Sequence, residues 1–343
     1  MNSSLKFLQA ENSHLREVIR KLQDNIRASE KQQVTTATIK KIIYGAQAGL
    51  VDQKPISWPA RVPSSPHKNP NLMPMLIMGD VHFGEVVDPR AIEGINKYDS
   101  DIAESRLRTM VEKCSSLLHR YIYAKYDGID LVLVGDNVTG NIHEELQITN
   151  DSTIPQAVLR LAPIYKWIIS SMTREFKRVR IVSVVGNHGR DRSKPYYKQY
   201  VWGNWDWLLL QFVRLMMLDD KRITWQLSDS TETQFSLYGK IFRVIHGDQF
   251  KGGAGVQGAW SPLFIGDFRR RKRQQSINKP YDFLVGGHWH QTINQSGIIF
   301  TGSVKGYDEF AYGMGFPAEP PQQMLIVWRP DGRMVYEMPV YLD

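Results

Sequence analysis

Five short segments of this 343-residue chain place Asp, Asn or His beside Gly directly after an apolar run. The segments are 79–82, 135–137, 186–189, 246–248 and 286–290. They contain five of the nine histidines, and each also carries Asp, Asn or a second His. Carboxylate oxygens and imidazole nitrogens that converge from several segments are typical ligands of a borderline divalent metal ion. The pattern therefore predicts a metal centre, although any one of these segments alone would more often be a turn.

The elements that would position these residues are strands and helices that alternate along the chain. Apolar runs typical of buried strands lie at 75–80, 130–136, 179–188, 242–248 and 283–288. Helical patterns lie between them at 101–126, 154–177, 197–218 and 262–276, and further strands follow toward the C-terminus. This alternation predicts an α/β fold with helices packed on buried strands. Because ligands bind at the carboxyl ends of strands in such sheets, we expect the five segments to meet there.

The N-terminal residues 1–31 are predicted to form a coiled-coil helix that dimerises the chain. One heptad position holds Leu5, Asn12, Ile19 and Ile26, and a second holds Leu8, Leu15 and Leu22. Isoleucine and leucine in these two positions favour a parallel two-stranded coiled coil, here over residues 3–30. A helix packed on its own domain and a helix that recruits a different protein remain open alternatives. A short helix and a Pro-rich linker are expected over 32–71, followed by a catalytic domain over 72–343.

Composition excludes several classes of protein. Hydrophobic residues make up 42% and charged residues 23%, which is ordinary for a globular protein and excludes collagen-like and wholly disordered chains. The single cysteine rules out an intrachain disulfide and favours a reducing, cytoplasmic setting. No apolar run reaches the ~20 residues of a membrane helix, and residues 1–21 lack the apolar core of a secretory signal. The net charge of +8 permits a polyanionic partner.

The five segments together resemble the calcineurin-like metallophosphoesterase family, whose motifs are D-x-H, G-D, G-N-H, a lone H and G-H-x-H in this order. The resemblance implies a four-layer α/β/β/α sandwich with two divalent metal ions at the strand ends. It implies that Asp136 bridges the ions and that the other ligands divide between them. The ligands implied for the first ion are Asp80, His82 and His290, and those for the second are Asn187, His246 and His288.

The chemistry of such a centre is hydrolysis of a phosphoester. Two ions hold a bridging water as hydroxide for in-line attack on phosphorus. Manganese is the first expectation, and iron or zinc fit the same ligands. The resemblance implies that His188 faces the phosphate as the catalytic residue. Gly189 and Thr139 stand where many relatives carry a carboxylate, which argues against a phosphoprotein phosphatase; Asp191 could replace the carboxylate that orients His188.

A nucleic-acid phosphodiesterase is the function that the sequence favours, in the repair-exonuclease branch of the family. The basic run 269–273 on a predicted helix could follow a phosphate backbone, or could equally be a solvated helix face. Candidate substrate-binding residues are Asn137, Arg190, Arg269, Arg270 and Arg271. A small-molecule or cyclic-nucleotide phosphodiesterase, a phosphomonoesterase and an inactive interaction scaffold of the same fold remain alternatives.

The coiled-coil prediction can be tested with Leu15→Pro. Proline in the middle of the heptads breaks the helix, so the variant should be monomeric where the unaltered chain is dimeric. Light scattering coupled to size-exclusion chromatography measures both masses. A chain that is already monomeric, or a variant that stays dimeric, would contradict dimerisation through residues 3–30.

Overall fold

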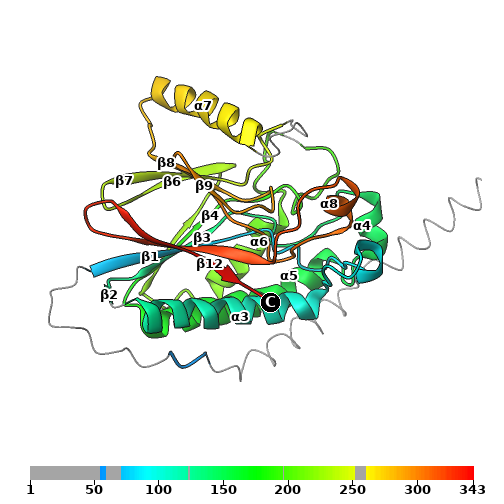
Figure 1. The fold of residues 1–343 in the computed structure, drawn as a ribbon, viewed down its shortest axis with the longest axis horizontal. Coiled ribbons are helices and arrows are strands. Elements are labelled where there is room, and N and C mark those ends of the chain that lie inside the picture. The colour runs from blue at the N-terminus through cyan, green and yellow to red at the C-terminus, as the bar shows by residue number, and fades with distance from the viewer. Residues whose placement is uncertain (1–54, 59–70, 123, 196, 252–259) are drawn as a thin grey trace, which may run out of the picture. The chain divides into compact units, whose positions relative to one another are not determined.

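A computed structural model describes residues 55–58, 71–122, 124–195, 197–251 and 260–343. The predicted coiled coil and most of the predicted linker lie outside these residues. Within the described residues, two β-sheets stack on each other and helices cover their outer faces (Figure 1). The prediction of a mixed α/β fold is confirmed. Among the described helices, none is both long and apolar enough to cross a membrane.

The first sheet has seven strands in the order β12-β11-β1-β3-β4-β5, with β2 paired to β1. Their bounds are β1 Asn71–Met78, β2 Lys125–Tyr126, β3 Ile129–Leu133, β4 Val179–Ser183, β5 Ile223–Leu227, β11 Gln322–Trp328 and β12 Met334–Tyr341. Strands β1, β3, β4 and β5 run parallel, whereas β11 pairs antiparallel with β1. The carboxyl ends of β1, β3 and β4 therefore lie at the same edge of the sheet.

The second sheet has five strands in the order β6-β7-β8-β10-β9. Their bounds are β6 Glu232–Leu237, β7 Lys240–Ile245, β8 Phe283–Gly286, β9 Ile293–Gln295 and β10 Ile298–Phe300. Strands β7, β8 and β10 are parallel, so their carboxyl ends also share one edge. The backbone N–H of Gly287 donates to the His246 carbonyl at 2.8 Å, which joins the loops that follow β7 and β8.

Helices lie on the outer face of each sheet. The helices are η1 Pro89–Ile92, α3 Ser100–Ser116, η2 Leu117–Tyr121, α4 Glu144–Thr149, α5 Ile154–Glu175, α6 Trp205–Leu215, α7 Trp260–Ser276 and α8 Glu309–Gly313. Figure 1 shows α3 and α5 along the first sheet and α7 beyond the second sheet, on the opposite side of the molecule. Helix α3 begins at Asp99, whose side chain accepts from the backbone N–H of Ile102.

Three buried clusters fill the spaces between four layers. Strand β1 shows the division, because Leu76 and Met78 pack toward the helices while Met75 and Ile77 pack between the sheets. Such alternation follows from successive side chains in a strand pointing to opposite faces. A third cluster, with Leu284 and Phe300 against Leu263, lies between the second sheet and α7. The layers therefore follow the order helix, sheet, sheet, helix.

Several observed elements differ from the predicted ones. Helix α6 begins after Asn204, whose side chain accepts from the Asp206 N–H, rather than at 197. Strands β5 and β6 are absent from the predictions, because their burial is only partial and their apolar pattern is weak. Within the expected linker, Trp58 packs on the body, and its indole N–H donates to the Ser171 carbonyl at 2.7 Å.

The inter-sheet cluster should contribute strongly to stability. Ile77→Ala removes a side chain that is 0% exposed, so we expect the free energy of unfolding to fall by about 2–5 kcal/mol. Denaturant unfolding measures this loss. Ile148→Ala is the control, since Ile148 is 85% exposed and its change should stay within about 0.5 kcal/mol. Equal effects of the two substitutions would contradict the layer assignment.

Candidate metal centre

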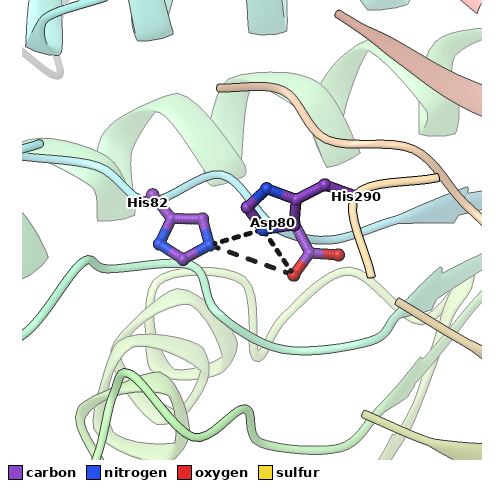
Figure 2. A group of neighbouring side chains, drawn as sticks. All are labelled: Asp80, His82 and His290. Carbon is purple, nitrogen blue, oxygen red and sulfur yellow. Dashed lines mark hydrogen bonds and ion pairs between the residues drawn. The ribbon is translucent and has the colours of Figure 1, made fainter. Parts of the chain in front are cut away.

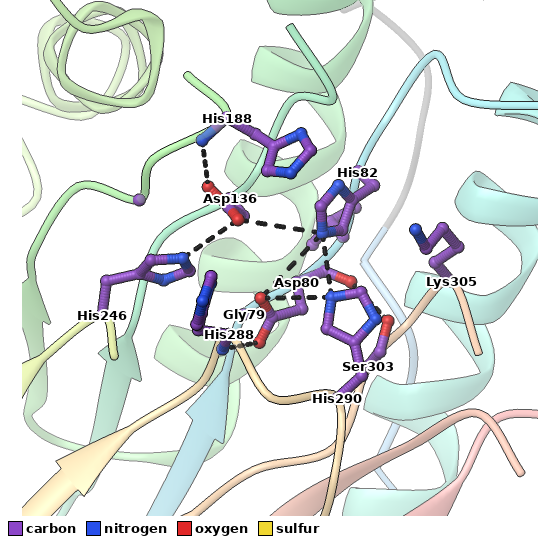
Figure 3. A network of polar contacts seen from close by, with 12 residues as sticks. Gly79, Asp80, His82, Asp136, His188, His246, His288, His290, Ser303 and Lys305 are labelled. Carbon is purple, nitrogen blue, oxygen red and sulfur yellow. Dashed lines mark hydrogen bonds and ion pairs between the residues drawn. The ribbon is translucent and has the colours of Figure 1, made fainter. Parts of the chain in front are cut away.

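The five predicted segments meet at the carboxyl ends of the strands (Figure 3). Backbone hydrogen bonds join the loops that carry them: Asp80 N–H donates to the Gly135 carbonyl at 3.0 Å, and His82 N–H donates to the Asp136 carbonyl at 2.9 Å. From the loop after β10, Val304 N–H donates to the Asp80 carbonyl at 3.1 Å. The polar side chains are thus held on a framework contributed by both sheets.

Asp80, His82 and His290 form one group of converging donor atoms (Figure 2). The Nε2 atoms of His82 and His290 lie 3.1 Å apart, and Asp80 Oδ1 lies 3.6 Å from His290 Nε2 and 4.0 Å from His82 Nε2. The second oxygen of Asp80 accepts from the backbone N–H of His288 at 2.8 Å. Oδ1 is buried and has no hydrogen-bond partner within the described part of the chain, so it is available to a cation.

Asp136, His246 and His288 form a second group. His246 Nε2 lies 3.0 Å from both Asp136 Oδ2 and Asn187 Oδ1, which adds the amide oxygen of Asn187 to this group. The opposite nitrogen, His246 Nδ1, lies 2.8 Å from the Val134 carbonyl. A carbonyl there keeps a proton on Nδ1, so Nε2 is the nitrogen that would bind an ion.

Asp136 lies between the two groups. Its Oδ2 is 3.8 Å from His82 Nε2, and its Oδ1 accepts from the backbone N–H of His188 at 2.7 Å. One carboxylate therefore faces a nitrogen of each group, as a bridging ligand would. Buried oxygen and imidazole donors in two adjoining groups fit a pair of divalent ions, so the residues present match the ligand set that the sequence predicts.

The protonation of the site agrees with cation binding. Burial lowers the pKa of His82 and His288 well below the usual range and that of His290 to about 3, so these rings are neutral and offer lone pairs. Burial also raises the pKa of Asp80 to about 7, whereas a cation would favour its ionised form.

Asp136 and His246 are charged in the absence of an ion. Burial acts against ionisation of Asp136, but His246 and His188 hold the pKa of this carboxyl well below its usual range. Burial acts to lower the pKa of His246, but the Asp136 carboxylate outweighs it and raises the pKa to about 10. A divalent ion would therefore displace a proton from His246.

Strained backbone aims the ligand side chains. Asp80, His82, Asp136, His288 and His290 all have φ between 48° and 72°, a left-handed conformation that is uncommon outside glycine. Such conformations cluster at functional sites, where the surrounding structure holds them in place. The neighbouring glycines make room: a Cβ on Gly186 would lie 2.0 Å from Asp136 Oδ1, and one on Gly287 would lie 2.4 Å from Asp80 Oδ2.

His188 is oriented by a backbone carbonyl. Its Nδ1 lies 2.9 Å from the Thr139 carbonyl, so Nε2 is the atom free to exchange a proton with a substrate. The expectation that Asp191 orients this ring is wrong, because the Asp191 carboxylate lies 3.6 Å from Arg192 and packs beside Gly203. The group that faces His188 Nδ1 is thus the main-chain carbonyl of Thr139.

Asp206 is a buried residue of the site that the sequence did not reveal. Its Oδ2 accepts from the backbone N–H groups of Asp136 and Gly186 at 2.9 Å, and its Oδ1 accepts from Asn137 N–H at 3.0 Å. One carboxylate thereby fixes the loops after β3 and β4. The available signal was the Asn204-x-Asp206 pattern, which marks a helix start, whereas the sequence predicted a helix that begins at 197.

Asn137 and Arg190 are engaged within the protein. Asn137 is fully buried, and its side-chain oxygen accepts from the hydroxyl of Tyr165 on α5 rather than facing the metal ligands. Arg190 donates to three main-chain carbonyls of its own loop, those of Asn187, Ser193 and Arg192, at 2.8–3.1 Å. Both residues shape the loops around the ligands.

The basic run on α7 divides into buried and exposed residues. Arg270 pairs with Glu232 on β6 at 2.6 Å, and its side chain is only 9% exposed. Arg271 pairs with Asp267 at 2.7 Å and donates to the Tyr281 carbonyl at 3.0 Å. These two arginines hold α7 on the second sheet. Arg273 is exposed but also pairs with Glu232, whereas Arg269 and Lys272 are exposed.

Comparisons with known proteins give distant structural similarities only. No family model and no curated protein matches the chain. A predicted phosphoesterase from Streptococcus pneumoniae is 12% identical, with 78% of this chain and 98% of that chain covered and a TM-score of 0.30.

Two further solved structures are similar at the same level. Vps29 from Entamoeba histolytica with zinc is 11% identical over 78% of this chain and 99% of that chain, with a TM-score of 0.30. A putative 5'-nucleotidase from Staphylococcus aureus is 13% identical over 80% of this chain and 55% of that chain, with a TM-score of 0.34.

Asp206→Asn should weaken the site without removing a ligand. The amide offers one acceptor in place of two, so at least one buried N–H loses its partner, at about 1–3 kcal/mol of unfolding free energy. Displaced loops should also weaken Mn²⁺ binding by roughly 10–100-fold. Calorimetric titration and denaturant unfolding measure both effects. Asp229→Asn, at an exposed carboxylate, is the control, and unchanged Mn²⁺ affinity in Asp206→Asn would contradict the assigned role.

Proposed function

We propose that this chain is a dinuclear metal-dependent phosphoester hydrolase of the calcineurin-like metallophosphoesterase superfamily. The observation that supports this most strongly is the position of Asp136, whose Oδ2 lies 3.0 Å from His246 Nε2 and 3.8 Å from His82 Nε2. In this proposal Asp80, His82 and His290 hold one ion, and Asn187, His246 and His288 hold the other. Manganese is the proposed ion, because the ligands mix oxygen and nitrogen.

Hydrolysis would use the metal ions together with His188. When bound, two divalent ions activate a water and neutralise charge on phosphoryl oxygens. His188 Nδ1–H is held by the Thr139 carbonyl, so the ring can transfer a proton only at Nε2. Burial lowers the pKa of His188, which leaves the free ring neutral. A phosphate beside Nε2 would favour the protonated ring, which then donates to the leaving oxygen.

We further propose that the substrate is a phosphodiester of the nucleic-acid class. The net charge of +8 supports this, together with the exposed Arg269 and Lys272 on α7. Because Arg270, Arg271 and Arg273 are engaged with Asp and Glu side chains, we expect Arg269 and Lys272 to make any contact of α7 with a phosphate backbone. A small-molecule or cyclic-nucleotide phosphodiester would use the same metal ligands.

The remaining proposals concern the assembly and location of the chain. We propose a homodimer through residues 3–30 and a cytoplasmic location, both on the sequence features described above. The convergence of seven ligand-type side chains at the strand ends supports an enzyme over an inactive scaffold of the same fold.

A hydrolysis panel with added Mn²⁺ tests the proposed reaction. A phosphodiester reporter, a phosphomonoester reporter, DNA, RNA and cyclic nucleotides are the substrates. Asp136→Ala should reduce turnover of any cleaved substrate by at least ~1000-fold, since it removes the shared ligand and disables both ions. Asp229→Ala, an exposed carboxylate, should not affect turnover. A wild-type chain that cleaves nothing, or an active Asp136→Ala, would contradict the proposed activity.

The nucleic-acid substrate has a separate test. The double variant Arg269→Glu, Lys272→Glu reverses two exposed charges, so it should weaken DNA binding and lower its salt dependence while sparing the small reporter. Fluorescence anisotropy at several salt concentrations measures the binding. Unchanged DNA affinity, or cleavage of cyclic nucleotides alone, would favour the small-molecule alternative.

A further inference from the structure

A buried carboxylate that belongs to none of the predicted motifs lies behind His82, in the loop after β1, and His188, in the loop after β4. Glu85 follows β1 in the same loop as His82, and it is 8% exposed. Its Oε2 accepts from the Thr139 hydroxyl at 2.6 Å. The carbonyl of the same Thr139 lies 2.9 Å from His188 Nδ1. Glu85 is therefore joined to His188 through the two polar groups of a single residue.

The same oxygen faces the ring of His82 on the side away from the metal ligands. Glu85 Oε2 lies 3.4 Å from His82 Nδ1, an atom that is buried and forms no hydrogen bond to the residues described. The opposite nitrogen, His82 Nε2, faces Asp80 and His290. A carboxylate behind a histidine ligand fixes its ring and places the proton on the nitrogen that does not bind metal.

A buried lysine holds Glu85 in this position. Lys305, in the loop after β10, is 3% exposed, and its Nζ lies 2.9 Å from Glu85 and 2.5 Å from Asp308. Figure 3 shows Lys305 beside the site. Burial acts to lower the pKa of Lys305, but the two carboxylates outweigh it and raise the pKa above the usual range. The Lys305 carbonyl in turn accepts from Arg106 at 2.6 Å and Asn96 at 2.9 Å, which fixes the loop.

We propose that Glu85, fixed by Lys305, is the positioning residue that sets the ring orientation of both His82 and His188. It would do for this chain what a carboxylate near the G-N-H motif does for many relatives. The effect of Glu85 on catalysis rests on the proposed function. Its effect on the orientation of the His82 and His188 rings rests on the contacts alone. A buried ion pair contributes little stability compared with apolar packing, so its place behind these rings favours a role in positioning.

Glu85→Gln tests the effect on His82. Glutamine keeps the shape but removes the charge, so we expect Mn²⁺ affinity to fall by roughly 10–100-fold. In the metal-free protein, ¹⁵N NMR of labelled histidines should show less of the Nδ1–H form of His82. Asp130→Asn is the matched control, because it breaks a buried ion pair with Arg180 at the other end of β3.

Thr139→Val tests the effect on His188. Because it removes only a hydroxyl, it can be measured even if Glu85→Gln does not fold. We expect kcat to fall roughly tenfold or more at unchanged KM and Mn²⁺ affinity, and Thr139→Ser to recover most of the loss. The Nδ1–H signal of His188 should also exchange faster with water in Thr139→Val.

Separate readouts distinguish failure of this inference from failure of the proposed function. If the wild-type chain cleaves no phosphoester, the proposed function fails. The role of Glu85 is then still decided by Mn²⁺ affinity, the His82 ¹⁵N signal and the exchange rate of the His188 Nδ1–H. The inference is overturned if Glu85→Gln binds Mn²⁺ within twofold of wild type with an unchanged His82 ring, or if Thr139→Val matches wild type in kcat and in His188 exchange.

Discussion

The strand-end site depends on one buried carboxylate, Asp136, which needs positive charge around it. It is 1% exposed, and it contacts His246 and the backbone N–H of His188. An isolated carboxylate in such a place would be costly, so the surrounding groups must compensate it. A proton on His246 can do this, and divalent ions can do it with the neutral rings as ligands. The arrangement around Asp136 therefore selects for cations.

The fold supplies this environment by bringing two sheets to a common edge. Parallel strands β1, β3 and β4 deliver Asp80, Asp136 and Asn187 from one sheet, while β7 and β8 deliver three histidines from the other. Asp206 and Glu85 then fix the connecting loops from opposite sides, one through backbone N–H groups and the other through Thr139. Loops held in this way can keep the left-handed conformations that aim the ligands.

The sequence predicted the parts of this arrangement that are local. Each ligand segment follows an apolar run, so the strands and their polar ends could be recognised without the structure. The sequence did not reveal the roles of Glu85, Lys305 and Asp206, because their partners are distant along the chain. Glu85 and Lys305 are 220 residues apart, and Asp206 and Asp136 are 70 residues apart. The sequence also did not reveal that Arg270 and Arg271 hold α7 in place. A basic run does not show that Arg270 pairs with Glu232 or that Arg271 pairs with Asp267. Distant pairing is set by tertiary packing, which a local pattern does not encode.

Electron paramagnetic resonance of the Mn²⁺-loaded chain tests whether Asp136 joins two ions in one site. Titration should saturate at two ions per chain, and the spectrum should show the spin coupling of two manganese ions that share a carboxylate. Saturation at one ion, or two ions with no coupling, would contradict the account.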